Sequence, residues 1–488
     1  MEKREVNMGF KIKKQKEDKK IEAINNLEEK YTVNLYTLGC RTNTYETFAM
    51  MTDLKNAGFK IVPFEEAADF SIINSCSVTN MSERKTRQVI NKEKKKNPDG
   101  TYVCVGCYAQ HAKPNEINAD LLLGNIEKTE ISKYLLDYID KNKEKFKKEY
   151  GKRNIEYNKF SEQIVSDVFE DKKYKEFKYS ANYIDEGRTR AIVKIQDGCD
   201  RFCTYCIIPY LRGRVRSREI ENILNEIKEA VSDGAKEIVL TGIHMTSFGK
   251  DFGYKENLID LLEKINEIQG VERIRIGSLE PKIITDEFID RIKKLDKLCM
   301  QLHLSMQSGS NTVLERMKRR YTIEEYMDAV YKLKYNIPDI RITTDVIVGF
   351  PGETEEEFNE TYENLKKMKL FKTHIFKYSP REGTVAAKMT GQIDGNIKNE
   401  RSKKLLELNK KNALEYLQSD IGKELEVLVE QEKHGIYFGY TKNYTKVGIK
   451  KEDVDKDIIN EIVKVKAKSV ENQEAEDTLE IYILGEIV

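Results

Sequence analysis

Three cysteines within eight residues constrain this chain more than any other feature. Cys199, Cys203 and Cys206 have Cys-x3-Cys-x2-Cys spacing, and thiolates this close together can bind three corners of a cubic 4Fe–4S cluster. No fourth cysteine follows nearby, so one iron would keep an open position at which a reactant can bind. The alternatives are a structural zinc site and three unrelated thiols, but the spacing and its surroundings favour a cluster.

A predicted strand, residues 191–195, leads directly into this triad. Ligands of parallel α/β folds bind at the carboxyl ends of strands, so a reactive cluster is expected here. Further strands are predicted at 237–241, 273–277, 301–304, 341–348 and 372–376, separated by helical patterns such as 219–231, 286–294 and 354–368. Six strand–helix repeats favour an open, partial (βα)6 barrel over the closed eight-fold barrel.

A separate parallel-sheet α/β unit is predicted before the triad, with strands at 33–38, 70–74, 102–105 and 121–123 and helices at 42–56 and 82–96. Cys40, Cys76 and Cys107 each follow one of the first three strands, so a parallel sheet would place them on one edge. From the residues alone, a shared metal site and ordinary buried thiols stay equally open. Cys104 competes with Cys107 but lies inside a strand, where a cysteine is usually a small core residue. Cys299 has the same interpretation.

The rest of the chain divides by composition. Residues 1–28 are predicted to be a charged extension, and residues 129–185 a charged connector. After a long polar helix at 397–418, five short strands at 425–430, 436–439, 445–449, 462–467 and 479–484 predict a small β-barrel. We therefore expect an α/β protein with three domains, at residues 29–128, 186–418 and 419–488.

The composition indicates the cellular compartment of the protein but not its binding partner. The 84 Lys and Arg residues nearly balance the 83 Asp and Glu residues, so net charge does not indicate a nucleic acid. The apolar runs are far shorter than the roughly 20 residues of a membrane span, and the charged N-terminus lacks a signal core. We expect a cytoplasmic protein with no membrane partner, whose clustered cysteines serve metal binding or catalysis rather than disulfides.

Local basic clusters nevertheless favour an RNA partner. Four arginines follow the triad closely, namely Arg212, Arg214, Arg216 and Arg218, and the predicted helix at 82–96 is rich in Lys and Arg. Beside an open cluster, such side chains suit phosphate contact, although a solvated basic surface is the alternative. The alternation of Tyr440, Lys442, Tyr444 and Lys446 suits base stacking with phosphate attraction. A purely structural β-cap is the alternative for this segment.

The strings around both triads resemble a known family. The string Lys194-Ile195-Gln196-Asp197-Gly198-Cys199, with Cys206-Ile207-Ile208-Pro209-Tyr210 and Arg212-Gly213-Arg214, is similar to the radical S-adenosylmethionine (SAM) superfamily and, within it, to the methylthiotransferases. Gly39-Cys40-Arg41, Ser75-Cys76-Ser77 and Gly106-Cys107-Tyr108 resemble the N-terminal cluster motifs of the same family. Residues 439–447 resemble a TRAM domain, an RNA-binding module.

The resemblance implies the cofactors and the residues that hold them. It implies two 4Fe–4S clusters, a catalytic one on Cys199, Cys203 and Cys206 and a second on Cys40, Cys76 and Cys107. It also implies SAM at the carboxyl ends of the barrel strands, with contacts from Thr241, Gly242, Ser278, Glu280, Gln307 and Asp345. The implied partners are tRNA, a cellular electron donor and a sulfur source.

Two features are similar to one branch of the family. Asp197 and the string from His374 to Thr384 resemble the bacterial enzymes that act on N6-threonylcarbamoyladenosine. This implies insertion of a methylthio group at C2 of that nucleoside, at position 37 of tRNA next to the anticodon. The alternatives are the isopentenyladenosine branch and a non-catalytic iron–sulfur RNA-binding protein, which would leave the open iron without a purpose.

Overall fold

The computed structural model describes residues 30–113, 115–146, 162–177, 189–475 and 478–488, and the charged extension predicted at residues 1–28 lies outside them. The chain folds into two compact units. The first contains the chain up to Asp171 together with Lys175–Ser180 and Tyr210–Arg212, and the second contains the rest. Within the described ranges, no helix combines the length and the apolar character needed to cross a membrane.

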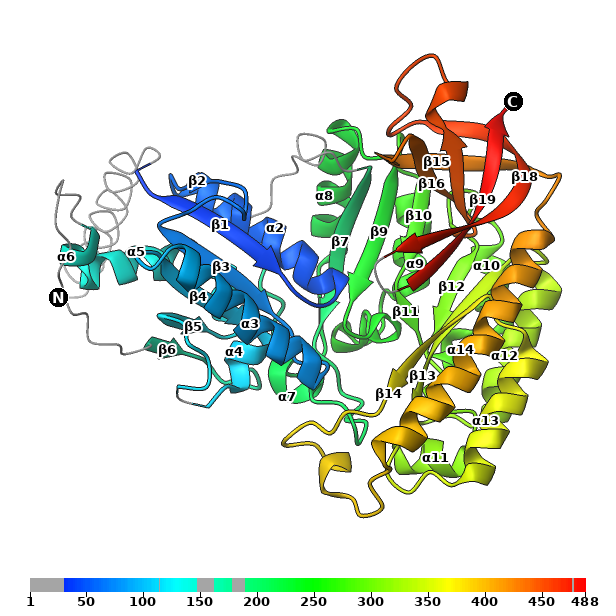
Figure 1. The fold of residues 1–488 in the computed structure, drawn as a ribbon, viewed down its shortest axis with the longest axis horizontal. Helices are drawn as coiled ribbons and strands as arrows, with labels where there is room; N and C mark the ends of the chain where they lie inside the picture. The colour runs from blue at the N-terminus through cyan, green and yellow to red at the C-terminus, as the bar shows by residue number, and fades with distance from the viewer. Residues whose placement is uncertain (1–29, 114, 147–161, 178–188, 476–477) are drawn as a thin grey trace. The chain divides into compact units, whose positions relative to one another are not determined.

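A six-stranded parallel sheet forms the centre of the first unit, in the order β2-β1-β3-β4-β5-β6 (Figure 1). Its strands are β1 (Thr32–Thr37), β2 (Lys60–Ile61), β3 (Phe70–Ser75), β4 (Thr101–Gly106), β5 (Leu121–Leu123) and β6 (Glu162–Ile164). The helices include α2 (Arg41–Asn56), α3 (Asn80–Lys96), α4 (Cys107–His111) and α5 (Ile131–Lys141). Every residue of β3 and β4 is buried, as expected for strands covered on both faces. The predicted parallel α/β sheet is therefore confirmed.

The segment predicted as a connector contributes structure to this first unit. Helix α5 places Ile131, Leu135 and Tyr138 in the core beside β3 and β4 residues, and β6 extends the sheet by pairing with β5. Strands β2 and β6 were not predicted, because β2 has only two residues and β6, with Glu162 and Gln163, has no apolar run.

The second unit contains an open barrel made of two four-stranded sheets, β10-β9-β7-β8 and β11-β12-β13-β14. The strands are β7 (Arg190–Asp197), β8 (Arg216–Ser217), β9 (Glu237–Gly242), β10 (Arg273–Ile276), β11 (Ser278–Leu279), β12 (Gln301–Leu304), β13 (Arg341–Val348) and β14 (Lys372–Lys377). All are parallel to their neighbours except β8. The six predicted strands are thus present, with β10 and β11 separated at Gly277.

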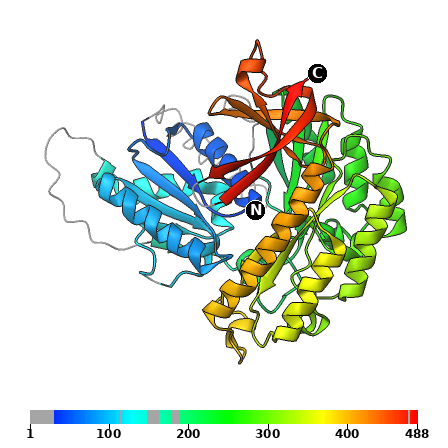
Figure 2. The same ribbon diagram turned by 45° about the vertical axis from the view of Figure 1, so that its right-hand side comes forward.

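Helices cover the outer face of this barrel. They are α8 (Ile220–Ser232), α9 (Leu258–Asn266), α10 (Asp286–Ile292), α11 (Asn311–Arg316), α12 (Ile323–Asn336), α13 (Glu355–Met368) and α14 (Gly395–Gln418). Figures 1 and 2 show α12, α13 and α14 side by side against the sheet that ends with β14. Capping boxes at Asn257, Thr322 and Thr354 start α9, α12 and α13, because each satisfies backbone N–H groups of the first turn.

A closed five-stranded barrel, β15-β16-β17-β19-β18, follows α14. Its strands are β15 (Glu424–Lys433), β16 (Ile436–Thr441), β17 (Lys446–Lys450), β18 (Ile462–Ala475) and β19 (Thr478–Ile487). Alternate residues such as Val427, Val429 and Val447 fill its core. The predicted small β-barrel is confirmed, and closure leaves its sheet without a free edge.

The small barrel packs on the amino ends of the open-barrel strands, through an ionic interface. Arg190 begins β7 and pairs with Glu430, and Arg341 begins β13 and pairs with Asp420. From β10, Arg273 donates to the carbonyl of Tyr440 at 2.7 Å. The amino ends are therefore closed by the small barrel, and the carboxyl ends, where ligands of such folds bind, lie at the opposite end.

The tyrosine–lysine alternation predicted to bind RNA belongs to this interface. The Tyr440 and Tyr444 rings stack on each other at 4.7 Å. The guanidinium of Arg275 lies 4.4 Å from the Tyr444 ring, and Arg190 lies 5.0 Å from Tyr440. Lys442 donates to the Asp296 carbonyl at 3.1 Å. Both tyrosines are partly buried and already contact a guanidinium, and base stacking by them stays a prediction.

We predict that Glu237→Gln destabilises the second unit strongly. The Glu237 side chain is 0% exposed and pairs with Arg275 at 2.8 Å and Arg190 at 3.3 Å. Burial alone would raise the pKa of Glu237, but these arginines outweigh it and hold the pKa below its usual value. Removing the carboxylate leaves buried guanidinium charge uncompensated, at a cost of about 3–5 kcal/mol. Urea unfolding measures this, with exposed Glu272→Gln as a control expected within about 0.5 kcal/mol of wild type. An equal effect of both variants would contradict the assignment.

Candidate active site

The first cysteine triad lies in a tightly turned loop after β7. Gly198 has φ +70°, and a Cβ there would lie 1.8 Å from the carbonyl oxygen of Arg214, so only glycine fits. The Cys199 amide donates to the Gly213 carbonyl at 3.0 Å, and the Cys206 amide donates to that of Cys203 at 3.0 Å. These bonds fold the loop back on itself and bring its three thiols together at the carboxyl end of the strand.

A network of charged side chains surrounds this triad. Arg319 donates to the Sγ of Cys203 at 3.3 Å. Buried Glu280 has three close partners: the His244 ring at 3.2 Å, the Arg319 guanidinium at 3.5 Å, and the guanidinium of Arg201 from the triad loop. Burial alone would raise the pKa of Glu280, but these partners lower it to about 2. Glu280 therefore stays ionised and fixes two arginines beside the cysteines, so that positive charge offsets that of bound thiolates.

The remaining residues predicted to contact SAM lie on or just after strands β9, β11, β12 and β13. Thr241 and Gly242 end β9, and exposed Ser278 begins β11. Gln307 follows β12 in a left-handed conformation, φ 73°, and its amide donates to the Asp345 carbonyl on β13 at 2.8 Å. Thr241, Gly242 and Gln307 thus lie at carboxyl strand ends, whereas Asp345 lies within β13, and their contact with a cofactor stays a prediction.

The second triad forms at three adjacent strand ends of the first unit. Cys40 follows β1 as the N-cap of α2, Cys76 follows β3, and Cys107 follows β4 as the first residue of α4. Gly39 has φ +106°, and a Cβ there would lie 2.7 Å from the Cβ of Cys76. The strand ends thus converge only because glycine lets the two segments approach closely.

The thiols of each triad lie close enough to influence one another. Burial first, then the neighbouring Cys107 and Cys40, raise the pKa of Cys76 to about 11. Burial and the neighbouring Cys203 and Cys199 raise the pKa of Cys206 to about 12. Iron binds the thiolate, so cluster assembly would displace these protons.

Both donor sets have the chemistry of iron–sulfur ligands, with three thiols each. Among the described residues, no three His, Cys, Asp or Glu side chains gather around one point as single-ion ligands would. A cubic cluster takes each thiolate on a different iron, so its cysteines encircle it instead of meeting at one point. Three cysteines and an arginine donor at the first triad fit such a group.

Asn125 is a further polar contact of the second triad. Its amide nitrogen lies 3.8 Å from the Cys107 Sγ and donates to the Leu211 carbonyl at 2.8 Å. The competing Cys104 is fully buried inside β4, packed with Ile73 and Leu122. Neither Asn125 nor Arg319 was predicted to be functional, because an asparagine in a loop and an arginine in a basic run carry no distinctive signal.

Three of the four arginines predicted to contact phosphate are buried. Arg212 is 1% exposed and pairs at 2.8 Å with Glu46, which also binds Lys128 at 2.5 Å. The structure also buries Arg216 and Arg218, which pair with Asp197 and Glu226 respectively. The prediction was wrong for these three, because their charges are already neutralised in the interior. Arg214 is 60% exposed and can still reach RNA.

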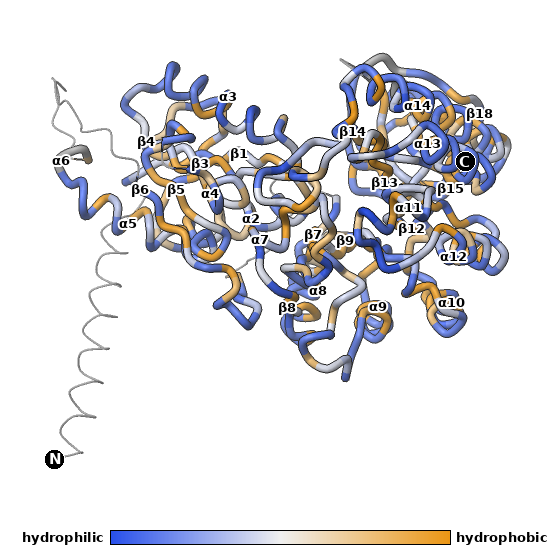
Figure 3. The backbone as a smooth tube through the Cα atoms, turned by 90° about the horizontal axis from the view of Figure 1, so that it is seen from below, coloured by the Kyte–Doolittle hydropathy of each residue, from blue (hydrophilic) through white to orange (hydrophobic). Residues whose placement is uncertain are grey.

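The exposed basic residues of α3 offer a better phosphate surface. Both acidic residues of the helix, Glu83 and Glu93, are buried, whereas its exposed basic side chains are Arg84, Lys85, Lys92, Lys95 and Lys96. Figure 3 shows the hydrophilic course of α3 beside the apolar strands of this unit. The solvent-exposed side of the helix is therefore positively charged.

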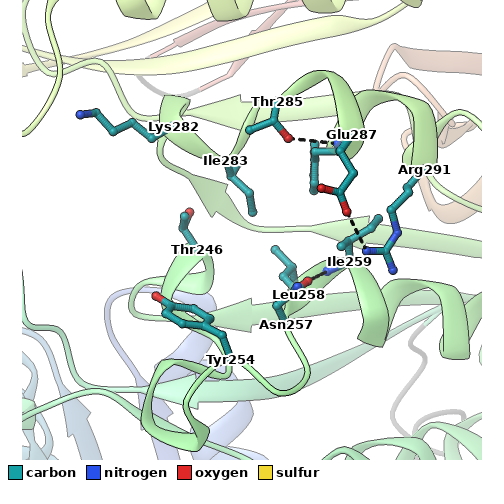
Figure 4. A pocket seen from close by; sticks show the side chains of 11 residues that line it. Thr246, Tyr254, Asn257, Leu258, Ile259, Lys282, Ile283, Thr285, Glu287 and Arg291 are labelled. Atoms are coloured by element: carbon teal, nitrogen blue, oxygen red, sulfur yellow. Dashed lines mark hydrogen bonds and ion pairs between the residues drawn. The ribbon is translucent and has the colours of Figure 1, made fainter.

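A cavity of about 270 Å³ lies between the loops that lead into α9 and α10 (Figure 4). Thr246 forms part of its wall, and the Thr246 hydroxyl accepts a hydrogen bond from the Glu280 amide at 3.0 Å. Apolar Leu258, Ile283 and Phe288 line it further. Its lining contains no cysteine or histidine, so it offers no cluster ligand.

Comparisons with known proteins agree with this geometry. Residues 193–365 match the radical SAM superfamily, and residues 32–124 match a family described as uncharacterized protein family UPF0004. The threonylcarbamoyladenosine tRNA methylthiotransferase MtaB of Bacillus subtilis is 43% identical over 89% of this chain and 93% of its own length. The Aquifex aeolicus protein of the same name is 39% identical over 85% and 95%. A tRNA-2-methylthio-N(6)-dimethylallyladenosine synthase of Thermoanaerobacter pseudethanolicus is 38% identical over 86% of each chain.

We predict that Cys107, and not Cys104, is the third ligand of the N-terminal triad. Cys107→Ala should remove about one cluster's worth of iron from the reconstituted protein, because two thiolates hold a cubane poorly. Cys104→Ala should keep the iron content of wild type and weaken the packing only slightly. Iron and sulfide analysis measures both variants. Loss of iron from Cys104→Ala alone would contradict the strand-end assignment.

Proposed function

The chain belongs to the family of radical SAM tRNA methylthiotransferases, and we propose that it inserts a methylthio group at C2 of N6-threonylcarbamoyladenosine next to the tRNA anticodon. The observation that carries this proposal is the presence of two cysteine triads, one in the loop after β7 and the other after β1, β3 and β4. Two triads fit a reaction that needs both hydrogen removal and a sulfur atom.

Each triad has its own role in this proposal. Cys199, Cys203 and Cys206 hold one 4Fe–4S cluster beside SAM, and Cys40, Cys76 and Cys107 hold the other. Bound there, the cofactors supply the one-electron chemistry that removes hydrogen from adenine C2, together with the sulfur and the methyl group. Arg319 and Arg201 stabilise the charge of the first triad, and Glu280 holds both arginines in place. The cofactors carry the difficult chemistry, so the chain contributes binding and electrostatics.

The partners follow from the reaction. A tRNA is the substrate, and a cellular electron donor and a sulfur source are required for repeated turnover. The cytoplasm is the proposed place of action, because tRNA is modified there.

The isopentenyladenosine branch is the second candidate. It is favoured by the similarity to synthases named for the dimethylallyl nucleoside, which match nearly as much of the chain. The two candidates differ in the group on N6 of the same adenine, which is anionic in one and an apolar hydrocarbon in the other.

Nucleoside mass analysis of tRNA from cells lacking this protein decides between them. We expect the 2-methylthio derivative of threonylcarbamoyladenosine to disappear and its unthiolated precursor to accumulate, while isopentenyladenosine derivatives stay unchanged. A variant with Cys199, Cys203 and Cys206 replaced by Ala should fail to restore it, because the open-iron cluster cannot form. Loss of the isopentenyl derivative instead would assign the chain to the other branch.

We predict that α3 supplies phosphate contacts to tRNA. Replacing Lys85, Lys92 and Lys95 by Ala should flatten the slope of log affinity against log salt by roughly one for each phosphate that the helix no longer binds. Lys403, Lys410 and Lys411 on α14 are equally exposed but have Glu407 among them, and their replacement is the matched control. Filter binding at several salt concentrations measures the slopes. Equal slopes for both triple variants would place the RNA elsewhere.

A further inference from the structure

Two histidines and an aspartate gather on one face of the sheet formed by β12, β13 and β14. Nε2 of His303 lies 3.1 Å from Oδ2 of Asp345, and the ring of His374 lies 5.9 Å from that of His303. Asp345 and His374 are direct cross-strand partners, and His303 is paired in register with Thr343. Side chains from three strands therefore form one polar cluster.

This cluster faces the interior of the open barrel. Successive residues of a strand point to opposite faces, and on β13 the buried Thr344, Val346 and Val348 alternate with the less buried Asp345 and Ile347. On β14, buried Thr373 and partly buried Ile375 alternate with exposed His374 and Phe376. The less buried face of these strands is thus turned away from the helices.

His374 is the exposed member of the cluster. His303 and Asp345 are partly buried and contact each other, and the Nδ1 of His303 lies 3.0 Å from the Thr343 hydroxyl. His374 is exposed, as is Phe376 two residues later on the same face, at 46%. An aromatic ring next to an imidazole offers a stacking surface beside a hydrogen-bond donor.

We propose that His374 binds the carboxylate of the threonylcarbamoyl group of the substrate, with the adenine packed against Phe376. This inference rests on the proposed function and deepens it to the recognition of the N6 substituent. An imidazole keeps at least one N–H donor in either protonation state, so it can bind a carboxylate. An isopentenyl group has no atom that could accept such a bond, and binding it would leave the polar cluster desolvated.

The test changes the His374 side chain of the protein and, separately, the carboxyl group of the substrate. Full-length protein with both clusters reconstituted is assayed on anticodon stem-loops that carry either threonylcarbamoyladenosine or its carboxyl methyl ester. Wild type should prefer the acid, and His374→Leu should lose about 10–100-fold in kcat/KM on the acid and little on the ester. His374→Gln should lose less than His374→Leu, because its amide still donates.

The matched control is His434→Asn, which changes an exposed histidine in the turn after β15. Asparagine tolerates the left-handed backbone found at this position, and the preference for the acid should match wild type. Iron content and melting temperature of every variant check that it is folded.

The outcomes separate this inference from the proposed function. If wild type acts on the threonylcarbamoyl RNA and both His374 variants keep its preference for the acid over the ester, the contact does not exist and the function stands. If wild type modifies only isopentenyladenosine RNA, the proposed function fails and the inference fails with it.

Discussion

Parallel pairing of neighbouring strands is the constraint on which both cysteine triads depend. It carries every strand of a sheet in the same direction, so residues far apart in the chain emerge at one edge. Cys40, Cys76 and Cys107 lie at one edge of the sheet because β1, β3 and β4 are neighbours in register. In the open barrel, the same geometry brings Arg319 and Glu280 to the loop that follows β7. Both cysteine triads therefore lie at the carboxyl ends of strands.

Buried ion pairs lie at the amino ends of the barrel strands and in the interior of the first unit. Glu237, Arg190 and Arg275 neutralise one another where the small barrel meets the amino ends of the strands. Glu46 does the same between Arg212 and Lys128 in the first unit. Such groups are costly to bury and stay charged only because each has a close partner of opposite sign. A charge-rich composition therefore describes the interior of this protein as well as its surface.

The sequence was sufficient for those features that depend on local pattern. Strand periodicity located the six barrel strands and the five strands of the small barrel, and cysteine spacing located the first triad. It was insufficient where a partner lies far along the chain: Arg319 reaches Cys203 across 116 residues, and Arg212 reaches Glu46 across 166. A basic residue has the same local pattern whether it meets a phosphate or a buried carboxylate, which is why Arg212, Arg216 and Arg218 were misassigned.

The last strand of the open barrel limits how far its sheet can extend. Strand β14 has no further strand beside it in the described chain. Helix α14 lies along it instead, and the Asn409 side chain accepts a hydrogen bond from the Thr373 amide at 2.6 Å. A backbone donor that is satisfied by a helix cannot pair with a further strand. The helix therefore terminates the sheet and protects its last strand from pairing with another chain.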